Sequence, residues 1–219
     1  MITILVLLAK TKQVLSYRYR QDFHGYICNL LGNNHYKTPQ NDYTYSNICG
    51  GRCTKEGIKF DGIPHFYIRT NSDSVLHNFM SNLSNTQFYN NLKGFHVLGF
   101  QIIESVLDKE FFETDASTPI LVSKKYNHIN LLSCTEINDT EKYLTESVFR
   151  KAKEMNIEID SKLSIKIAKQ RMHRDIQYGH AINKGRNLVL GINCNRETKE
   201  FILLHGIGRS SSCGFGFLK

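Results

Sequence analysis

The 219-residue sequence has no tryptophan, only three prolines and no apolar run long enough to cross a bilayer. Its most apolar stretch, MITILVLLAK at residues 1–10, is about half of the roughly 20 residues that a membrane span requires. The stretch also lacks the basic flank and the small-residue cleavage site of a signal peptide. We therefore expect a buried first strand, a cytoplasmic location and no membrane contact.

Cysteine pairs are also scarce. The six cysteines are scattered along the chain, and only Cys49 and Cys53 lie close together. No second pair stands at zinc-ligand spacing, so the sequence predicts no metal site. Scattered cysteines are typical of free thiols in a reducing compartment.

The common nucleotide-binding motifs are missing, although the C-terminal stretch HGIGRSSSCGFGFLK is rich in glycine. It holds four of the fifteen glycines, namely Gly206, Gly208, Gly214 and Gly216. A dinucleotide fingerprint needs G-x-G-x-x-G opening a helix, but Ser211 stands three residues after Gly208 and no helix can follow before Lys219. The Walker pattern is absent as well. We therefore expect no cofactor, and we interpret the loop as an anion-binding backbone nest or a tight terminal hairpin.

Positive charge is in clear excess. The chain has 28 Lys and Arg against 20 Asp and Glu, a net charge of +8, which favours a polyanionic partner such as nucleic acid. Residues 136–160 hold seven acids and four bases, whereas residues 162–187 hold seven bases and one acid. Within the basic stretch, KQRMHRDIQYGH mixes cations with Met, His and Tyr, as in surfaces that contact phosphates and stack bases. Ordinary solvated lysines are the alternative.

The first half predicts elements in the order β-α-β-β-α-β, which is the ferredoxin-like pattern. We expect strands at residues 1–10, 43–51, 65–70 and 94–106, a hairpin at 52–60, and helices at 16–32 and 71–84. Each helix has an apolar stripe at helical spacing, the first ending at a glycine and the second starting behind a Ser72/Asp73 cap. The stripes are Tyr19, Phe23, Tyr26, Ile27, Leu30 and Leu31 before Gly32, and Val75, Leu76, Phe79, Met80 and Leu83.

The second half predicts a similar but less regular unit. We expect strands at residues 118–125, 162–169, 187–193 and 200–206, and one helix at 139–156 with Leu144, Val148, Ala152 and Met155 on one face. Alternation in Gly214–Phe217 predicts a last strand with both Phe rings on one side. The fold class is therefore α+β: two tandem ferredoxin-like (RRM-like) domains, 1–110 and 111–219, the second a degraded variant without its second helix. The boundary is placed within residues 107–117.

The terminal stretch LLHGIGRSSSCGFGFLK resembles the C-terminal glycine-rich loop of the CRISPR-associated repeat-RNA endoribonucleases. These belong to the repeat-associated RNA-binding (RAMP) superfamily of tandem ferredoxin-like proteins. The first strand, the YRYRQDFHGYI helix and the YTYSNI strand are similar to that family's opening elements, with Tyr45 where Phe is usual. TPILVSKK is similar to the strand that opens the second domain.

The resemblance implies cleavage of CRISPR precursor RNA within its repeats, without metal or cofactor. The 2′-hydroxyl attacks the adjacent phosphate and leaves a cyclic phosphate and a 5′-hydroxyl. Imidazole suits the proton transfers, because its unperturbed pKa of about 6.5 lies near working pH. The family's catalytic histidine lies in or just after the first helix, so we take His35 as the candidate base and His24 as the alternative. Lys37 is expected to stabilise the developing charge, and Tyr26 to orient substrate or share the proton transfer.

RNA contacts are expected mainly from arginines, lysines and the glycine loop, because phosphate contacts dominate such interfaces. Ser46 could hydrogen-bond the scissile phosphate or be a structural hydroxyl. The candidate RNA-binding residues are Arg18, Arg20, Lys169, Arg171, Arg174, Lys184, Arg186, Gly206, Gly208, Arg209, Gly214 and Gly216.

The expected partner is CRISPR repeat RNA, and the sequence leaves open whether the protein also forms a homodimer or joins other subunits of an effector complex. The main alternative function is a non-catalytic RNA-binding subunit of such a complex, which needs the basic surface and the glycine loop but no catalytic histidine. A basic ferredoxin-like protein unrelated to CRISPR is a third interpretation, which leaves the terminal glycine loop unexplained.

Overall fold

The computed structural model describes residues 1–9, 14–32, 42–83, 95–104, 111–116, 118–122, 137–178, 181–209 and 211–219. At residues 172–175, 177, 181, 182, 184 and 212 it describes the backbone alone. The chain forms two compact units. Unit 1 comprises Met1–Ser105 together with Gln177–Ile182, and unit 2 comprises Val106–Ile176 and Asn183–Lys219. The short segment 177–182, which the sequence analysis assigned with the rest of the second domain, is thus grouped with unit 1.

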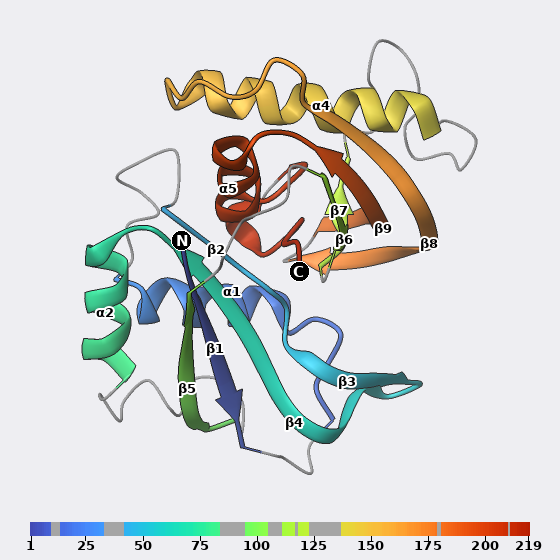
Figure 1. The fold of residues 1–219 in the computed structure, drawn as a ribbon. Coiled ribbons are helices and arrows are strands. Elements are labelled where there is room, and N and C mark those ends of the chain that lie inside the picture. The colour runs from blue at the N-terminus through green and yellow to red at the C-terminus, as the bar shows by residue number, and fades with distance from the viewer. Residues whose placement is uncertain are drawn as a thin grey trace. The chain divides into compact units, whose positions relative to one another are not determined.

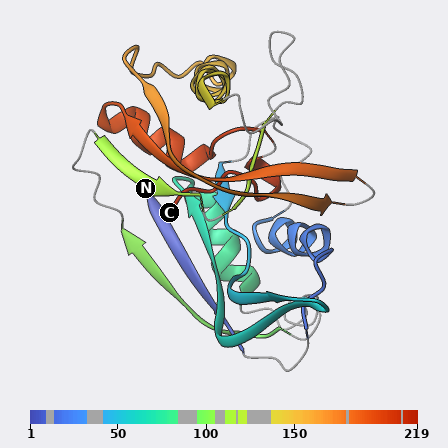
Figure 2. The same ribbon diagram turned by 90° about the vertical axis from the view of Figure 1, so that its right-hand side faces the viewer.

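Unit 1 is an antiparallel sheet with two helices on one of its faces (Figures 1 and 2). Its sheet order is β2-β4-β1-β5, with β3 paired to β4 as a hairpin, and this is the strand order of a ferredoxin-like domain. The predicted β-α-β-β-α-β succession is confirmed. The elements are β1 (Ile2–Leu8), α1 (Arg20–Leu30), β2 (Tyr43–Tyr45), β3 (Cys49–Thr54), β4 (Gly57–Thr70), α2 (Asp73–Leu83) and β5 (Val97–Glu104).

The core of unit 1 lies between the sheet and its helices, as the alternation in β1 requires. Ile4, Val6 and Leu8 are buried, whereas the intervening side chains point to the other face. The predicted stripe of α1 is buried throughout, and the Phe23 ring makes edge contacts with Tyr45 and Phe66. Together these contacts fix α1, which carries the candidate His24, against the sheet.

The second helix begins and packs largely as expected. Ser72 Oγ accepts a hydrogen bond from the Val75 amide, which is the predicted cap. Val75 and Phe79 are buried, but Met80 is 44% exposed. Met80 follows Phe79 by one residue, and this rotation of about 100° carries its side chain from the core to the solvent side.

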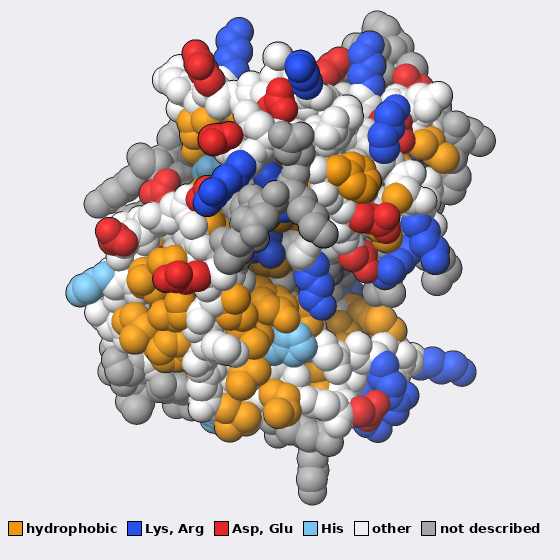
Figure 3. Space-filling model, viewed as in Figure 1, with side chains coloured by type: hydrophobic (Ala, Val, Ile, Leu, Met, Phe, Trp, Pro, Cys, Tyr) orange, Lys and Arg blue, Asp and Glu red, His pale blue; other side chains and the backbone are white. Residues whose placement is uncertain are grey.

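Apolar side chains also gather on the surface of unit 1, over β1, β4 and β5 (Figure 3). On β5, three apolar residues are exposed, namely Leu98, Ile102 and Ile103. Ile102 is paired with buried Ile4, so it lies on the opposite face of the sheet from Ile103. Strand β5 is the edge strand of the order β2-β4-β1-β5, so it has a neighbouring strand on one side only.

Unit 2 is built around the long hairpin of β8 and β9, which Figures 1 and 2 show side by side. Strand β9 also pairs with β6 and, further along, with β7. The elements are β6 (Phe111–Asp115), β7 (Ile120–Leu121), α4 (Ile137–Glu154), β8 (Ser164–Tyr178), β9 (Ala181–Asn193), α5 (Arg196–His205) and the 3₁₀ turn η1 (Ser211–Cys213).

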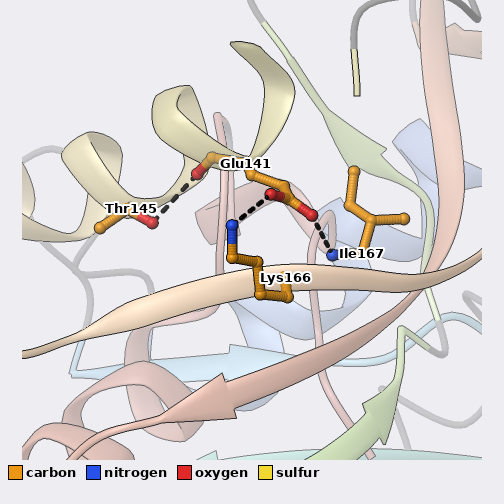
Figure 4. A network of polar contacts seen from close by, with 4 residues as sticks. All are labelled: Glu141, Thr145, Lys166 and Ile167. Atoms are coloured by element: carbon orange, nitrogen blue, oxygen red, sulfur yellow. Dashed lines mark hydrogen bonds and ion pairs between the residues drawn. The ribbon is translucent and has the colours of Figure 1, made fainter. Parts of the chain in front are cut away.

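Polar contacts fasten α4 to the hairpin (Figure 4). The Glu141 carboxylate accepts hydrogen bonds from Lys166 Nζ at 2.9 Å and from the Ile167 amide at 2.8 Å. One turn further along α4, Thr145 Oγ1 donates to the Glu141 carbonyl. Because the Ile167 amide belongs to β8, the carboxylate joins a helix to a strand that follows it in the sequence.

Residues 111–115, within the predicted boundary segment, form β6 and pair with β9. Two expectations for the second half are wrong, namely the strand at 200–206 and the missing second helix. Residues 200–206, predicted as a strand, lie mostly in α5, so the second helix is present after all. The side chain of Asn195 caps that helix by accepting from the Thr198 amide. The run Phe201–Leu204 is buried on all sides, and such a short apolar run does not distinguish a strand from a buried helix.

The predicted last strand, Gly214–Phe217, is also replaced by another conformation. Gly214 and Gly216 have φ of +77° and +65°, which no extended strand allows. Only the final residues return to the sheet: Leu218 bridges Ala116, and Thr114 Oγ1 donates to the Lys219 carbonyl at 2.7 Å. The chain end therefore lies beside β6, at the position of the fourth strand of a ferredoxin-like sheet.

Within the described ranges, no helix combines the length and the apolar character needed to cross a bilayer.

Candidate functional site

The glycine-rich loop follows α5 and is folded back on itself. Gly206 caps α5, and its amide donates to the Ile202 carbonyl. The Ile207 amide then donates to the Gly216 carbonyl at 3.0 Å, which joins the beginning of the loop to its end. Further amides of the loop donate to the segment around β7, namely Gly216 to the Pro119 carbonyl and Arg209 to the Leu121 carbonyl. The loop is therefore a defined structure held by backbone hydrogen bonds.

Close backbone approach explains the glycine at position 216. Its φ is +65°, and a Cβ there would overlap the carbonyl of Ile207. Gly206, Gly208 and Gly214 likewise have positive φ. The sequence pattern thus marks positions where side chains cannot be placed, and this brings backbone close to backbone.

The loop presents its apolar residues inward and its charge outward. The rings of Phe215 and Phe217 are fully buried, and the Phe217 amide donates to Thr118 Oγ1 at 2.7 Å. The side chain of Arg209 is exposed. This is the arrangement expected of a loop with aromatic anchors and one external cation.

A half-buried lysine contacts the same loop from α4. Lys151 Nζ donates to the carbonyls of His205 and Gly206 at 2.9 and 3.1 Å, and to Ser211 Oγ at 2.9 Å. Burial lowers the pKa of Lys151 to about 8, an effect that nearby Glu154 partly offsets. The side chain therefore remains mainly protonated at neutral pH. Sequence analysis did not single out Lys151, because it stands among other charged residues of an apparently solvated helix.

The basic stretch of β8 exposes two of its predicted RNA contacts. Lys169 and Arg171 lie on the surface and line an open groove of about 470 Å³, together with Glu113 and Asp115. Arg171 forms an ion pair with Asp115 at 2.8 Å. The side chains of Arg174 and Lys184 lie outside what the structure describes.

Arg186 is placed differently from its prediction. Its side chain has 0% exposure and donates from Nη1 to Thr140 Oγ1 on α4 at 2.8 Å. A guanidinium buried between α4 and β9 cannot reach a phosphate on the surface. The prediction of an RNA contact at this position is therefore corrected to a structural role.

The arginines near the start of α1 are accessible to different degrees. Arg18 is exposed and lines a small pocket of about 160 Å³ with Tyr19, Asp22 and Phe95. Arg20 is half-buried, and its Nη1 donates to Asn47 Oδ1 at 2.8 Å. Arg20 thus orders the segment after β2, whereas the side chain of Arg18 lies on the surface.

His24 is half-buried in α1, and its ring lies beside Tyr45, Cys28 and Tyr178. Its Nδ1 shares a 2.6 Å hydrogen bond with the hydroxyl of buried Tyr45, and its Nε2 lies 3.5 Å from Cys28 Sγ. If Nδ1 accepts from the Tyr45 hydroxyl, the neutral ring carries its proton on Nε2 and can only donate there. If Nδ1 donates instead, Nε2 has the lone pair that a general base needs.

The structure describes only one of the three remaining catalytic candidates, Tyr26. His35 and Lys37 lie outside the described residues. Tyr26 is a core residue with 4% exposure, packed against Phe23 and Phe66. Burial of this ring does not fit a substrate-orienting role, so the prediction for Tyr26 is corrected to a packing role.

The contacts of Ser46 favour a structural hydroxyl over a hydrogen bond to the scissile phosphate. The residue is fully buried, its Oγ donates to the Asn47 carbonyl, and it accepts from the Tyr67 amide.

Among the residues that the structure describes, no group of three His, Cys, Asp or Glu side chains could hold a metal ion.

Comparisons with known proteins give a structural answer and no sequence match. No protein-family model matches the chain, and no curated protein matches it significantly. Among solved structures, a Cas6-related protein from Pyrococcus furiosus has a TM-score of 0.80 at 18% identity, covering 100% of this chain and 97% of that one. A RAMP protein described as binding different RNA substrates has a TM-score of 0.76 at 17% identity, covering 100% and 99%. A CRISPR RNA processing endoribonuclease, Cas6b, has a TM-score of 0.56 at 17% identity, covering 100% and 98%. The chain thus has the tandem ferredoxin-like fold of the Cas6 and RAMP proteins over its whole length.

Proposed function

We propose that this protein is a metal-independent endoribonuclease that cleaves CRISPR precursor RNA within its repeats to produce guide RNAs. The observation that carries the proposal is the full-length fold, shared with a protein named as a CRISPR RNA processing endoribonuclease. The net charge of +8 and the ordered glycine-rich loop with exposed Arg209 support an RNA partner. The proposed location is the cytoplasm.

In the proposed reaction, a base removes the proton of a 2′-hydroxyl and its oxygen attacks the neighbouring phosphorus. The bond from phosphorus to the 5′-oxygen then breaks, and an acid protonates that leaving oxygen. The products are a 2′,3′-cyclic phosphate and a 5′-hydroxyl, so no water and no redox partner is consumed. Cations next to the phosphate stabilise the charge that develops on its oxygens.

We assign the base to His35 and the stabilising cation to Lys37, following the family resemblance. His24 is the alternative, and its contacts weaken that case. It is half-buried, one ring nitrogen is engaged by Tyr45, and the other lies beside Cys28. Only the tautomer with the proton on Nδ1 would give His24 a basic Nε2.

The proposed RNA contacts are the exposed cations on the two units and the glycine-rich loop. In unit 1 they are Arg18 and, less accessibly, Arg20; in unit 2 they are Lys169, Arg171 and Arg209. Arg174 and Lys184 remain in the proposed set on the basis of sequence, and buried Arg186 is left out. These contacts would give salt-dependent affinity, because each phosphate contact releases counterions.

Cleavage assays with repeat RNA test the proposal. In excess EDTA, the wild type should cut RNA at one position and leave a cyclic phosphate, and it should fail to cut RNA with a single 2′-deoxy substitution at that position. Continued cleavage of the deoxy substrate, or cleavage that EDTA abolishes, would contradict the mechanism. Tight binding without any cleavage would instead favour a non-catalytic RNA-binding subunit of an effector complex, and one structure of the same fold is described only as binding RNA.

A further inference from the structure

The contact between Lys151 and the glycine-rich loop uses the full donor capacity of the side chain. A protonated lysine has three N–H donors, and three acceptors lie within hydrogen-bond distance: the carbonyls of His205 and Gly206 and the hydroxyl of Ser211. The two carbonyls belong to the end of α5, and the hydroxyl belongs to η1. One side chain from α4 therefore joins the first and the middle parts of the loop.

The location of these acceptors makes a cation favourable there. The last carbonyls of a helix have no partner within the helix, and they carry the negative end of its dipole. At the C-terminus of α5, Lys151 supplies both the missing donors and the positive charge. The charged groups that act on its side chain include Glu154 and Arg150 on α4 itself. The ring of His205, whose carbonyl accepts from Lys151, packs against Phe201.

Backbone hydrogen bonds hold the other side of the loop. The Pro119 and Leu121 carbonyls accept from the amides of Gly216 and Arg209, so β7 and the residue before it fix the outer part. Neither bond reaches η1 or the carbonyls at the end of α5. Among the contacts that position η1 relative to α5 are those of Lys151, the Ile207–Gly216 bond and the burial of the Phe215 and Phe217 rings.

We propose that Lys151 is a positioning residue for RNA binding: its ammonium holds the glycine-rich loop in the shape that presents Arg209 and the loop backbone to RNA. The RNA part of this proposal rests on the proposed function, whereas the effect of Lys151 on the loop does not. The residue itself is half-buried, and its ammonium donors are directed to the loop, so it would not contact RNA directly. Its loss should therefore weaken binding without slowing the cleavage of RNA that is already bound.

The experiment compares the wild type with Lys151→Met, which keeps the length of the side chain and removes its donors and charge. A matched control is Glu141→Ala, which removes another buried polar contact of α4 that lies on β8 and away from the loop. Two quantities are measured for each protein. They are the hydrogen-exchange rates of amides in residues 206–209 and 211–216, and the RNA affinity together with the single-turnover cleavage rate at saturating RNA.

We expect Lys151→Met to accelerate exchange in the loop by about tenfold and to weaken RNA binding by a similar factor, because hydrogen bonds to a charged donor are lost. The saturating cleavage rate should stay within about twofold of the wild type, since a positioning residue does not touch the reacting atoms. Glu141→Ala should change neither loop exchange nor RNA affinity. Should Lys151→Met fail to fold, Lys151→Gln, which keeps two N–H donors, should accelerate exchange at the same amides by a smaller factor.

Wild-type exchange rates in a folded Lys151 variant would overturn the proposal. So would equal acceleration in Glu141→Ala, which would indicate general loosening of unit 2. If loop exchange accelerates while even the wild type fails to bind RNA, the effect of Lys151 on the loop is confirmed and the proposed function is wrong. If exchange accelerates but RNA affinity is unchanged in an RNA-binding wild type, the link between loop shape and binding is wrong.

Discussion

The two units follow the same plan until their second helices end, and there they diverge. In unit 1 the chain after α2 forms β5, a full edge strand paired with β1. In unit 2 the chain after α5 forms a glycine-rich loop, and only its last residues return to β6. A shared plan fixes the fold, so a departure from it marks where a different requirement acts. In unit 2 that requirement is a close approach of backbone to backbone, which Gly206, Gly208 and Gly216 allow.

The units also differ in the chemistry that they offer. Unit 1 carries the candidate histidines, in and after α1, whereas the ordered glycine loop and the exposed cations of β8 belong to unit 2. We therefore expect changes at the candidate histidines of unit 1 to affect the chemical step, and changes at the glycine loop and the exposed cations of unit 2 to affect RNA affinity. The predictions below test this division.

The largest effect is expected from His35→Ala. Loss of a general base typically lowers a rate by about 10²- to 10⁴-fold, so the single-turnover cleavage rate should fall by that factor while RNA affinity is retained. His24→Ala serves as the comparison and should retain most of the activity. The reverse pattern, with His24→Ala inactive and His35→Ala active, would move the base into α1.

Glycines of the two units should respond in opposite directions to alanine. Gly216→Ala should lower the free energy of unfolding by about 1–3 kcal/mol, because its φ is positive and the new Cβ meets the Ile207 carbonyl. Gly25 lies at an exposed position of α1, and a Cβ added there would have no atom within 4 Å. Gly25→Ala should therefore raise the free energy of unfolding by about 0.5–1 kcal/mol. Denaturant unfolding measures both, and a neutral Gly216→Ala would contradict the close packing of the loop.

The contact between α4 and β8 pairs a buried acceptor, Glu141, with an exposed donor, Lys166, and the two should contribute unequally to stability. Glu141→Ala leaves the Ile167 amide without its carboxylate and should destabilise the protein by about 1–3 kcal/mol. Lys166→Ala removes an ammonium whose side chain is 72% exposed and should lower stability by less than about 1 kcal/mol. Equal losses in denaturant unfolding would mean that the ion pair, and not the bond to the amide, fastens the helix.

The pH dependence of stability should distinguish two cations whose pKa is lowered by burial, Lys151 in unit 2 and Arg69 in unit 1. Folding lowers the pKa of Lys151 from 10.5 to about 8, so between these values the unfolded chain holds more protons than the folded one. Its contribution to the free energy of unfolding therefore rises with pH, by about 1 kcal/mol between pH 7 and 9. In unit 1, burial lowers the pKa of Arg69 only to about 10, which places its effect at higher pH. The rise should be absent in Lys151→Met, measured over the same pH range; an identical rise there would assign it to other groups.

The sequence predicts unit 1 better than unit 2, for physical reasons. Alternation in β1 and the stripe of α1 each have one buried face, so their periods are visible in the residues. In unit 2, the run Phe201–Leu204 of α5 is buried throughout and shows no clear period. Strand β6 lies in a segment whose acidic residues resemble a linker. Helix α5 could still have been predicted from Asn195, because asparagine is a favourable residue at the N-cap of a helix.

The candidate site was predictable in its outline and not in its supporting contacts. Clustered glycines indicated a close backbone approach, and four positive φ values agree with it. Burial could not be inferred for single cations, because Arg186 and Lys151 stand in charged stretches where most neighbours are exposed. Their partners, Thr140 and the end of α5, are separated from them by 46 or more residues, and only folding brings such groups together.

The assignment of cleavage to unit 1 and of RNA binding to unit 2 is tested most directly by measuring cleavage rate and RNA affinity together for His35→Ala and Arg209→Ala. At saturating RNA, His35→Ala should lose cleavage and keep the wild-type affinity at every salt concentration. Arg209→Ala should keep the saturating rate and bind more weakly, with a salt slope smaller by roughly 0.7 if one phosphate contact is lost from single-stranded RNA. A His35→Ala protein that cleaves at the wild-type rate, or an Arg209→Ala protein with unchanged affinity and salt slope, would contradict the account.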